Sequence, residues 1–530
     1  MYLSVQRRAR RAHPLTAATL ALAAVLTATV PALAAATKVI HAFSGPDGAQ
    51  PMAALIQATD GYFYGTTPFG GAMYGTPQTT DGYGTVFRIG ATGQVTVLHS
   101  FDRCDPAGYE PRGALIQASD GFFYGTTARG GKGNACGRSL DTRRGTVFRM
   151  DRDGNITTIH TFNDYHDGDA PWAGLVEGPD GALYGTTRVG GDIQQAWPLG
   201  RGTVFKVTKG GDFTVLRRFT GPDGVNPIAP LARAANGRLY GTTNMMRSVN
   251  GSGGGTIFQI TPSTGAFKLL HVFGQFEGAG PRGRLVQHPA DGYLYGVTVA
   301  GGYGGALAGV IYRIHPSGAP FEVIVHLGRD GGYQSTGTRP QDGLTLVDDG
   351  SFYGTTQFGG QPIDGDREGT VFRVRRNGRF GIVHTFAGGP EGLQPATALV
   401  QGSNGKLYGM AYGGEHSRGI VYRYAPDARA VLLGVGVKPR ELWAGDPAFG
   451  IATGTVILDG RAPAGGAVVG LTSSQPGLVQ VPQTVTVAPG WSTADFSVTS
   501  SSSDEEQTVT ITAMFGGVSR SVTIAVHPSF

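Results

Sequence analysis

The sequence predicts an all-β protein, a seven-bladed β-propeller followed by an immunoglobulin-like β-sandwich. Three observations lead to this prediction. A Tyr-Gly pair recurs seven times at a spacing of 55 to 60 residues, glycine fills 88 of the 530 positions, and the repeats give way near residue 431 to short alternating segments. Repetition at this period is typical of solenoids and propellers. Glycine supplies the positive φ angles that many tight turns need.

Residues 1–34 have the pattern of a secretory signal peptide. Four arginines precede an apolar run over residues 15–30, and small residues around Ala32 and Ala34 follow it. A signal peptide has this order of charge, apolar core and cleavage site. A spanning helix needs roughly 20 apolar residues, whereas this run is shorter and contains threonines. We expect cleavage near Ala34, a secreted, periplasmic or cell-surface location, and no membrane span after signal removal.

The charge balance argues against a nucleic-acid partner. The whole chain has 43 Lys and Arg against 38 Asp and Glu, a formal net charge of +5. Removing the signal takes away four arginines and no acidic residue, which leaves the mature chain close to neutral. We find no basic stripe of the kind that binds DNA or RNA.

Each repeat is expected to form four antiparallel strands. The first is an apolar segment with a proline at its start, where the ladder does not need the missing N–H. An Asp-Gly or Asn-Gly turn then leads into a Tyr-Gly-Thr-Thr strand. A variable loop, a Gly-Thr-Val-Phe strand and a fourth strand such as residues 95–99 complete the unit. The opening prolines are Pro51, Pro111, Pro171, Pro227, Pro281, Pro340 and Pro395.

Seven such units, over residues 38–426, can close a ring without exposed sheet edges. Residues 39–43 match the fourth-strand pattern but have no unit of their own, and no convincing copy follows the seventh unit. We therefore expect this N-terminal strand to complete the last blade. The alternative is that residues 430–433 complete it.

The pattern Asp-Gly-x-x-Tyr-Gly-Thr-Thr, Gly-Gly and Gly-Thr-Val-Phe resembles the GloVer-type tandem repeat of secreted bacterial proteins. The resemblance implies an exported, propeller-like protein and transfers no activity to particular residues. The fourth unit departs from the pattern, since Met245 and Met246 stand near the place where the other six units have paired glycines. We expect its loop to differ.

Residues 431–530 are predicted to form the immunoglobulin-like sandwich. About seven alternating strands separated by Gly, Pro and Ser turns are typical of such a module. Residues 462–469, with Ser473 and Ser474, are similar to bacterial immunoglobulin-like modules of cell-surface proteins. The segment has no cysteine, so its core must depend on packing alone.

A side chain that recurs in every unit is expected to belong to the scaffold. Histidine occupies the fourth strand in six copies, and Arg217 takes its place in the remaining one. A metal or acid-base role is the alternative, but a hydrogen bond repeated in each blade explains the pattern better. An acidic residue four positions before the opening proline is interpreted as a turn former.

Function is expected in residues that differ between the units, on the face where the long loops lie. Aromatic rings beside carboxylates suit sugars, and paired carboxylates could serve glycoside hydrolysis at a defined separation. The alternative is that Trp172 packs under its loop and the acidic residues are solvated. The candidate binding residues are Asp164, Tyr165, His166, Asp167, Asp169, Trp172, Asp192 and Trp197.

Cys104 and Cys136 lie in loops of the same face and are predicted to form a disulfide in an oxidising compartment. In the chain-entropy model such a bridge raises the free energy of unfolding by roughly 3 to 4 kcal/mol. Asp364, Asp366 and Glu368 could hold calcium, but they lack the full spacing of a recognised calcium loop. We therefore predict no metal site and no cofactor.

The sequence thus predicts a secreted protein that binds an extracellular glycan or a cell-surface protein through its long-loop face. We assign no catalytic residue. The alternative is a propeller enzyme acting on polysaccharide, a glycoside hydrolase or lyase, whose acidic residues come from the same face.

Overall fold

The computed structural model describes residues 37–528 apart from 77–78, 132–143, 164–165, 192–199, 249–250, 275, 304–307, 329–335, 360–367, 427–431, 448, 459–461, 464, 490 and 517. Regular structure in the described residues is β-strand throughout, except for one 3₁₀ turn, η1 (Gly389–Glu391). None of the helical structure in this part of the chain has the length and apolarity needed to cross a membrane. The predicted signal peptide, residues 1–34, lies outside the described residues.

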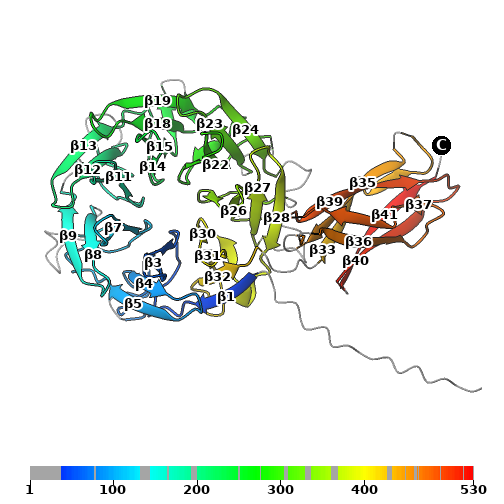
Figure 1. Ribbon diagram of the computed structural model, residues 1–530, viewed down its shortest axis with the longest axis horizontal. Helices are drawn as coiled ribbons and strands as arrows, with labels where there is room; N and C mark the ends of the chain where they lie inside the picture. Colours follow the sequence, from blue (N-terminus) through cyan, green and yellow to red (C-terminus); the bar gives the residue numbers. More distant parts are fainter. Residues whose placement is uncertain are drawn as a thin grey trace, which may run out of the picture. The chain divides into compact units, whose positions relative to one another are not determined.

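The repeats form antiparallel sheets that follow one another around a central axis (Figure 1). We call them repeat sheets and number them in the order of their Tyr-Gly pairs. The first three are β2 (Ile56–Gln57), β3 (Phe63–Thr67), β4 (Thr85–Ile89), β5 (Val95–Ser100); β6 (Ile116–Gln117), β7 (Phe123–Thr127), β8 (Thr146–Met150), β9 (Ile156–Thr161); and β10 (Val176–Glu177), β11 (Leu183–Thr187), β12 (Thr203–Val207), β13 (Phe213–Arg218).

The next three repeat sheets keep this order, with the shortest strand nearest the axis and the fourth strand outermost (Figure 1). They are β14 (Ala232–Arg233), β15 (Leu239–Thr243), β18 (Thr256–Ile260), β19 (Phe267–Val272); β20 (Ala279–Pro281) with β21 (Val286–Gln287), β22 (Leu294–Ala300), β23 (Val310–Ile314), β24 (Phe321–His326); and β25 (Thr345–Leu346), β26 (Phe352–Thr356), β27 (Thr370–Val374), β28 (Phe380–Thr385). In the fourth unit the expected difference is confirmed, because β16 (Met246–Ser248) and β17 (Gly251–Gly253) form a separate two-stranded ribbon.

The seventh repeat sheet joins the two ends of the repeat region. It contains β29 (Leu393–Pro395), β30 (Val400–Gln401), β31 (Leu407–Tyr412), β32 (Ile420–Tyr424) and, as its outermost strand, β1 (Thr37–Ala42). β1 pairs antiparallel with β32, with Thr37 opposite Tyr424 and Ala42 opposite Ile420. The expectation that the N-terminal strand completes the last sheet is therefore confirmed. Leu432 and Leu433, part of the alternative segment, belong instead to a strand that pairs with a later sheet.

The glycine of each Tyr-Gly pair makes room for the core of its own sheet. A Cβ atom on Gly185 would lie 2.4 Å from Cζ of Phe205 and 2.8 Å from Cδ2 of Leu175. The leucine comes from the first segment and the phenylalanine from Gly-Thr-Val-Phe, and both are buried. The tyrosine next to the glycine is also fully buried. The repeat thus conserves a close-packed set of side chains, which explains why its residues recur together.

Neighbouring repeat sheets are joined by ring contacts and hydrogen bonds. The Tyr64 ring of the first sheet stacks on Phe123 of the second, with centroids 4.2 Å apart. The Thr126 hydroxyl of the second sheet donates to the carbonyl of Ala173 in the third, at 3.1 Å. These contacts recur between other sheets, so each sheet is supported by its neighbours.

The C-terminal region consists of two sheets around one hydrophobic core. One sheet has the order β33 (Leu432–Lys438), β35 (Ile451–Leu458), β39 (Thr493–Ser500), β37 (Val479–Gln480); the other has β34 (Glu441–Trp443), β41 (Val518–His527), β40 (Gln507–Phe515), β36 (Ala467–Ser473), β38 (Thr484–Val487). Val456 and Val498 from the first sheet share a buried cluster with Val509 and Ile524 from the second. Burial alternates along β35, as expected for strands that present one face to a core.

We predict that Gly185→Ala destabilises the protein by about 1 to 3 kcal/mol, because the added methyl group overpacks the site between Phe205 and Leu175. Thermal unfolding followed by circular dichroism measures the effect. Gly210→Ala is the matched control, since an added Cβ there meets nothing closer than 3.7 Å. Equal stability of the two variants would contradict the packing role assigned to the repeated glycine.

Candidate functional site

The chain enters each repeat sheet through a backbone corner. The residue before the opening proline has a positive φ, between 50° and 68°, in all seven copies. Six of the seven are not glycine, although other residues rarely adopt such angles. The corner residues are Gln50, Glu110, Ala170, Asn226, Gly280, Arg339 and Gln394.

Hydrogen bonds to the preceding sheet hold the corners in place. The Glu110 N–H donates to the carbonyl of Tyr83 in the first sheet, at 2.9 Å. The Gln50 N–H donates to the carbonyl of Arg418 in the seventh sheet, at 2.7 Å, so the same bond also closes the ring. A strained backbone conformation persists only where the surrounding contacts hold it. Here the held corner sets the direction of the residue after the proline.

The residue after each opening proline lines a central cavity of about 940 Å³. All seven sheets contribute this position, and its side chain differs from sheet to sheet. The seven residues are Met52, Arg112, Trp172, Ile228, Arg282, Gln341 and Ala396. We call the end of the cavity next to the corner residues the mouth.

The described cavity lining is rich in guanidinium groups, supplied by Arg112, Arg282, Arg284 and Arg339. Half-buried Arg282 donates to two neutral amides, Oε1 of Gln341 at 2.9 Å and Oδ1 of Asn244 at 3.4 Å. Its burial, together with the positive charges of Arg339 and Arg188, lowers the pKa of Arg282 from its ordinary value. The mouth is therefore electropositive, with cations from several sheets acting on one another.

Trp172 supports two of these cations. The guanidinium carbons of Arg188 and Arg112 lie 4.1 Å and 4.8 Å from the centroid of its ring, within the range of cation–π contacts. Arg112 also pairs with Glu110, at 3.3 Å between Nη2 and Oε2, while its buried Nε has no hydrogen-bond partner among the described residues. The indole ring thus orders the arginines at the mouth.

Asp342 supplies the one carboxylate among the described residues that line the cavity. Its oxygens accept the backbone N–H groups of Gly343, at 2.7 Å, and Ala398, at 2.8 Å. Burial raises the pKa of Asp342, against the effect of these hydrogen bonds and of the Arg284 charge, which favour the ionised form. The hydrogen bond from Ala398 links the sixth and seventh sheets, whereas that from Gly343 is local to the sixth.

The predicted binding residues have different positions in the structure. Trp172 lines the cavity. Asp167 pairs with His160, and buried Asp169 exchanges backbone hydrogen bonds with Val189. The carbonyl of His166 accepts Arg218 Nε at 3.1 Å. Four of the predicted residues lie outside the described residues: Asp164, Tyr165, Asp192 and Trp197.

The arginines of the mouth were not predicted from the sequence. The available signal was the position after each opening proline, which varies among repeats in which that proline and the leucine four residues after it are constant. Aligning the seven repeats on their prolines would have placed Arg112, Trp172 and Arg282 in one ring of positions. An exposed aromatic pair was also missed: Phe276 and Tyr303 are 56% and 63% exposed, and their rings stack at 5.3 Å.

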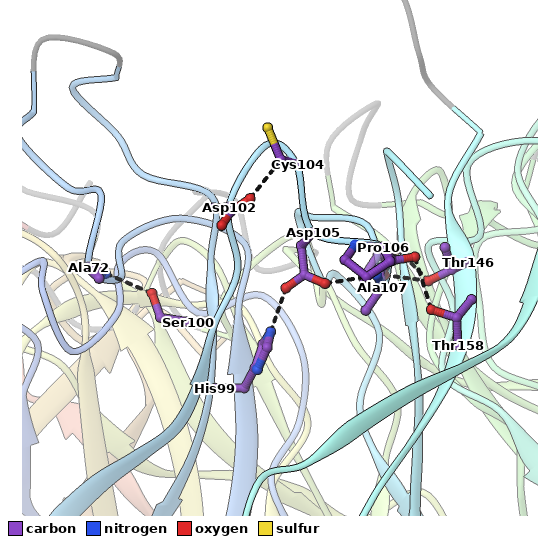
Figure 2. A network of polar contacts seen from close by, with 11 residues as sticks. Ala72, His99, Ser100, Asp102, Cys104, Asp105, Pro106, Ala107, Thr146 and Thr158 are labelled. Atoms are coloured by element: carbon purple, nitrogen blue, oxygen red, sulfur yellow. Dashed lines mark hydrogen bonds and ion pairs between the residues drawn. The ribbon is translucent and has the colours of Figure 1, made fainter. Parts of the chain in front are cut away.

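The recurring histidines have the hydrogen-bonding role expected of scaffold residues. His99 Nε2 lies 2.6 Å from Oδ2 of Asp105, whose Oδ1 accepts the N–H of Ala107 (Figure 2). The pair closes the connection between the first and second sheets. The same hydrogen bond joins His41 to Asp47 and His160 to Asp167, and in the third sheet Arg217 donates to Asp223. His271 and Glu277, and likewise His384 and Glu391, lie within ion-pair distance, at 3.2 Å and 3.1 Å.

The predicted disulfide and the calcium alternative at residues 364–368 fall largely on residues that are not described. Cys104 lies at the tip of its loop (Figure 2), where its N–H donates to Oδ1 of Asp102 at 2.6 Å. Cys136 lies outside the described residues, as do Asp364 and Asp366. Within the described ranges, no three His, Cys, Asp or Glu side chains are grouped so as to hold a metal ion.

These features define a repeat-built, propeller-like all-β protein in which non-repeating charges converge on a central cavity. The chain belongs to the Gloeobacter/Verrucomicrobia repeat family, whose model matches residues 27–192, 134–336 and 304–434. No curated protein matches the chain.

Several solved structures are similar at low identity. An ulvan lyase of polysaccharide lyase family 25 is 11% identical, with 71% of this chain and 93% of that chain covered and a TM-score of 0.41. The Fusarium graminearum GH93 α-L-arabinofuranosidase is 12% identical, with 63% and 98% covered and a TM-score of 0.39. The Trypanosoma rangeli sialidase is 10% identical, with 93% and 88% covered and a TM-score of 0.36. None of these likenesses transfers an activity to this chain.

The His41–Asp47 pair makes the stability of the ring dependent on acid pH. Burial opposes ionisation of Asp47, but hydrogen bonds from His41 and Ser44 outweigh it and lower the pKa from 3.8 to about 2. A lowered pKa stabilises the folded state above the ordinary pKa, and this stabilisation is lost as the pH falls through the folded-state value. The shift corresponds to about 2 kcal/mol.

We therefore predict that Asp47→Asn lowers the free energy of unfolding by about 2 kcal/mol near neutral pH. The difference from the wild type should shrink as the pH falls from 3.8 to about 2. Urea titrations across this range measure it. Asp153→Asn, at an exposed turn, is the control. A difference independent of pH would exclude the charge of Asp47 as its cause.

Proposed function

We propose that this chain is an exported seven-bladed β-propeller, residues 38–426, followed by an immunoglobulin-like sandwich, residues 431–530. In this proposal, residues 1–34 are a cleaved signal, and the mature protein binds an extracellular glycan or a cell-surface protein. The mouth of the central cavity is the binding site. The single observation that carries the proposal is the ring of unlike side chains presented by seven equivalent positions.

The contrast between constant and variable positions supports binding at the mouth. The repeated glycines, tyrosines, threonines and histidine–acid pairs are engaged within the scaffold. The position after each proline has no such common partner and changes from methionine to arginine, tryptophan and glutamine. A rigid scaffold that holds varied side chains around a cavity is the usual form of a binding site.

The exposed aromatic pair favours a carbohydrate ligand. Phe276 precedes β20, and Tyr303 follows β22, at the end where Ala279 pairs with Ala300. The pair therefore lies at the same end of the fifth sheet as the corner residue Gly280 and the mouth residue Arg282. Exposed aromatic rings offer apolar faces on which sugar rings can pack.

The alternative function, an enzyme acting on polysaccharide, requires acid-base groups at the cavity. Glycoside hydrolysis generally uses two carboxylates at a defined separation. In the described lining, Asp342 is a candidate acid because burial raises its pKa, and both of its oxygens accept backbone hydrogen bonds. Because the described lining has several guanidinium groups and this one carboxylate, its composition favours binding over catalysis.

We predict that the mature protein binds glycans on an array and releases no reducing sugar from them. Trp172→Ala should weaken binding about tenfold or more, because Arg112 and Arg188 lose the ring that orders them. Tyr62→Ala is a matched control, since it removes an exposed ring under Arg88 at the hairpin end of its sheet.

Three results are informative for this proposal. Catalytic release of sugar would support the enzyme alternative. Equal loss of binding in Trp172→Ala and Tyr62→Ala would show that the binding site is not at the mouth. Absence of any binding to glycans or cell surfaces would overturn the proposed function.

We also predict that Cys104 and Cys136 are disulfide-linked in the exported protein. Peptide mapping under non-reducing conditions should yield one linked fragment that reduction separates into two. Thermal unfolding should then occur at lower temperature after reduction, since a bridge of this kind contributes roughly 3 to 4 kcal/mol. Detection of both thiols free in exported material would show that the prediction is wrong.

A further inference from the structure

We infer that the ligand at the mouth is anionic: Arg282, together with Arg339 and Arg112 of the same cavity lining, binds a carboxylate or sulfate group of an acidic saccharide. The inference rests on the proposed function and adds the chemical class of the ligand. It is argued from the charges at the mouth, their partners and their fixed positions.

Among the described residues that line the cavity, four arginines face one carboxylate, that of Asp342. Within this described part of the chain, the hydrogen bonds of Arg282 go to the neutral amides of Gln341 and Asn244. Arg339 makes a ring contact with Phe358, at 5.7 Å, and has no carboxylate partner among the described residues. Arg112 shares Glu110 with Arg129, which lies 3.2 Å from the other carboxylate oxygen. Half-buried charges are costly unless they are paired, so an anionic ligand would supply the missing partner.

The arginines also act unfavourably on one another. Arg282 comes from the fifth sheet, Arg339 from the corner of the sixth and Arg188 from the third, yet the charges of the last two lower the pKa of Arg282. Arg282 and Arg339 both line the cavity, and Arg188 lies over the ring of Trp172, which lines it too. An oxyanion placed among them would relieve the repulsion and accept charge-assisted hydrogen bonds, for which the planar guanidinium group is well suited.

The donors are held in place before any ligand arrives. Arg282 is tied to Gln341, which in turn donates to Oε1 of Gln357 at 2.7 Å. Arg112 lies over the Trp172 ring, and its buried Nε is a donor that has no hydrogen-bond partner within the described part of the chain. Ordered donors reduce the conformational entropy that binding would otherwise cost. The arrangement therefore suits a ligand that presents a fixed acidic group.

A saccharide explains the remaining features of this face. Amide groups beside the arginines, those of Asn244, Gln341 and Gln357, can bind hydroxyls as both donors and acceptors. The Phe276–Tyr303 pair lies at the same end of the fifth sheet as Arg282. A cavity of about 940 Å³ is within the size range of small-ligand sites. A sugar chain could place one acidic unit in the mouth and pack another on the aromatic pair.

Calorimetric titration of the mature full-length protein at low salt tests the inference. The probes are an oligogalacturonate, a sulfated galactan oligosaccharide, a neutral cello-oligosaccharide, inorganic sulfate and a short poly-glutamate. We expect at least one acidic oligosaccharide to bind about tenfold or more tightly than the neutral one, and its affinity to fall as salt is added. The two acidic probes distinguish carboxylate from sulfate.

Arg282→Gln should weaken acidic-oligosaccharide binding about tenfold or more, because one charged donor is lost. Arg282→Lys should retain part of the affinity, since it keeps the charge but not the planar geometry. Arg152→Gln, at an exposed turn, is the control and should bind as the wild type does. Without ligand, the unfolding temperature of Arg282→Gln should equal or exceed that of the wild type, because removal of a like charge relieves repulsion.

The outcomes separate this inference from the proposed function. Equal binding of neutral and acidic oligosaccharides would overturn the anionic ligand and leave glycan binding in place. Equally tight binding of poly-glutamate or of sulfate alone would overturn the saccharide class. Failure of every saccharide to bind would overturn both proposals. Unchanged affinity of Arg282→Gln for the acidic oligosaccharide would show that Arg282 does not bind the ligand.

Discussion

One backbone hydrogen bond, repeated around the ring, is the constraint on which the structure depends. The N–H of each corner residue donates to a carbonyl that precedes the third strand of the neighbouring sheet, as Glu110 does to Tyr83. This bond holds a backbone angle that a non-glycine residue would otherwise avoid. It also links successive sheets and sets the direction of the residue after the proline. Scaffold and cavity lining are therefore fixed by the same local geometry.

The two sets of residues have opposite energetic roles. Close packing around residues such as Gly185 and Phe205 stabilises each sheet, while the arginines at the mouth repel one another. Sites that bind charged ligands commonly contain groups that are unfavourable for the empty protein. A ring of sheets that support their neighbours can tolerate such a cluster, because the cost is small relative to the packing of many equivalent cores.

Much of the fold could be predicted from the sequence, because the repeat shows every strand seven times. The pairing of β1 with β32 was predictable for the same reason, since residues 39–43 carry a pattern without a unit of their own. The mouth was harder to predict. Arg282, Arg339 and Arg188 are far apart in sequence and meet only because the ring closes, and the positive φ of Arg339 has no signature in composition. Of the binding residues predicted from the sequence, Trp172 lines the cavity.

The pairing of β1 with β32 has a consequence for how the chain is made. The first described strand finds its partner only after the seventh repeat has emerged, so closure of the ring is a late event in folding. Until then β1 lacks its partner strand and presents an unpaired edge to other chains. A polypeptide that stops before Ile420 would keep its first strand unpartnered, and premature termination would therefore favour aggregation over a smaller folded product.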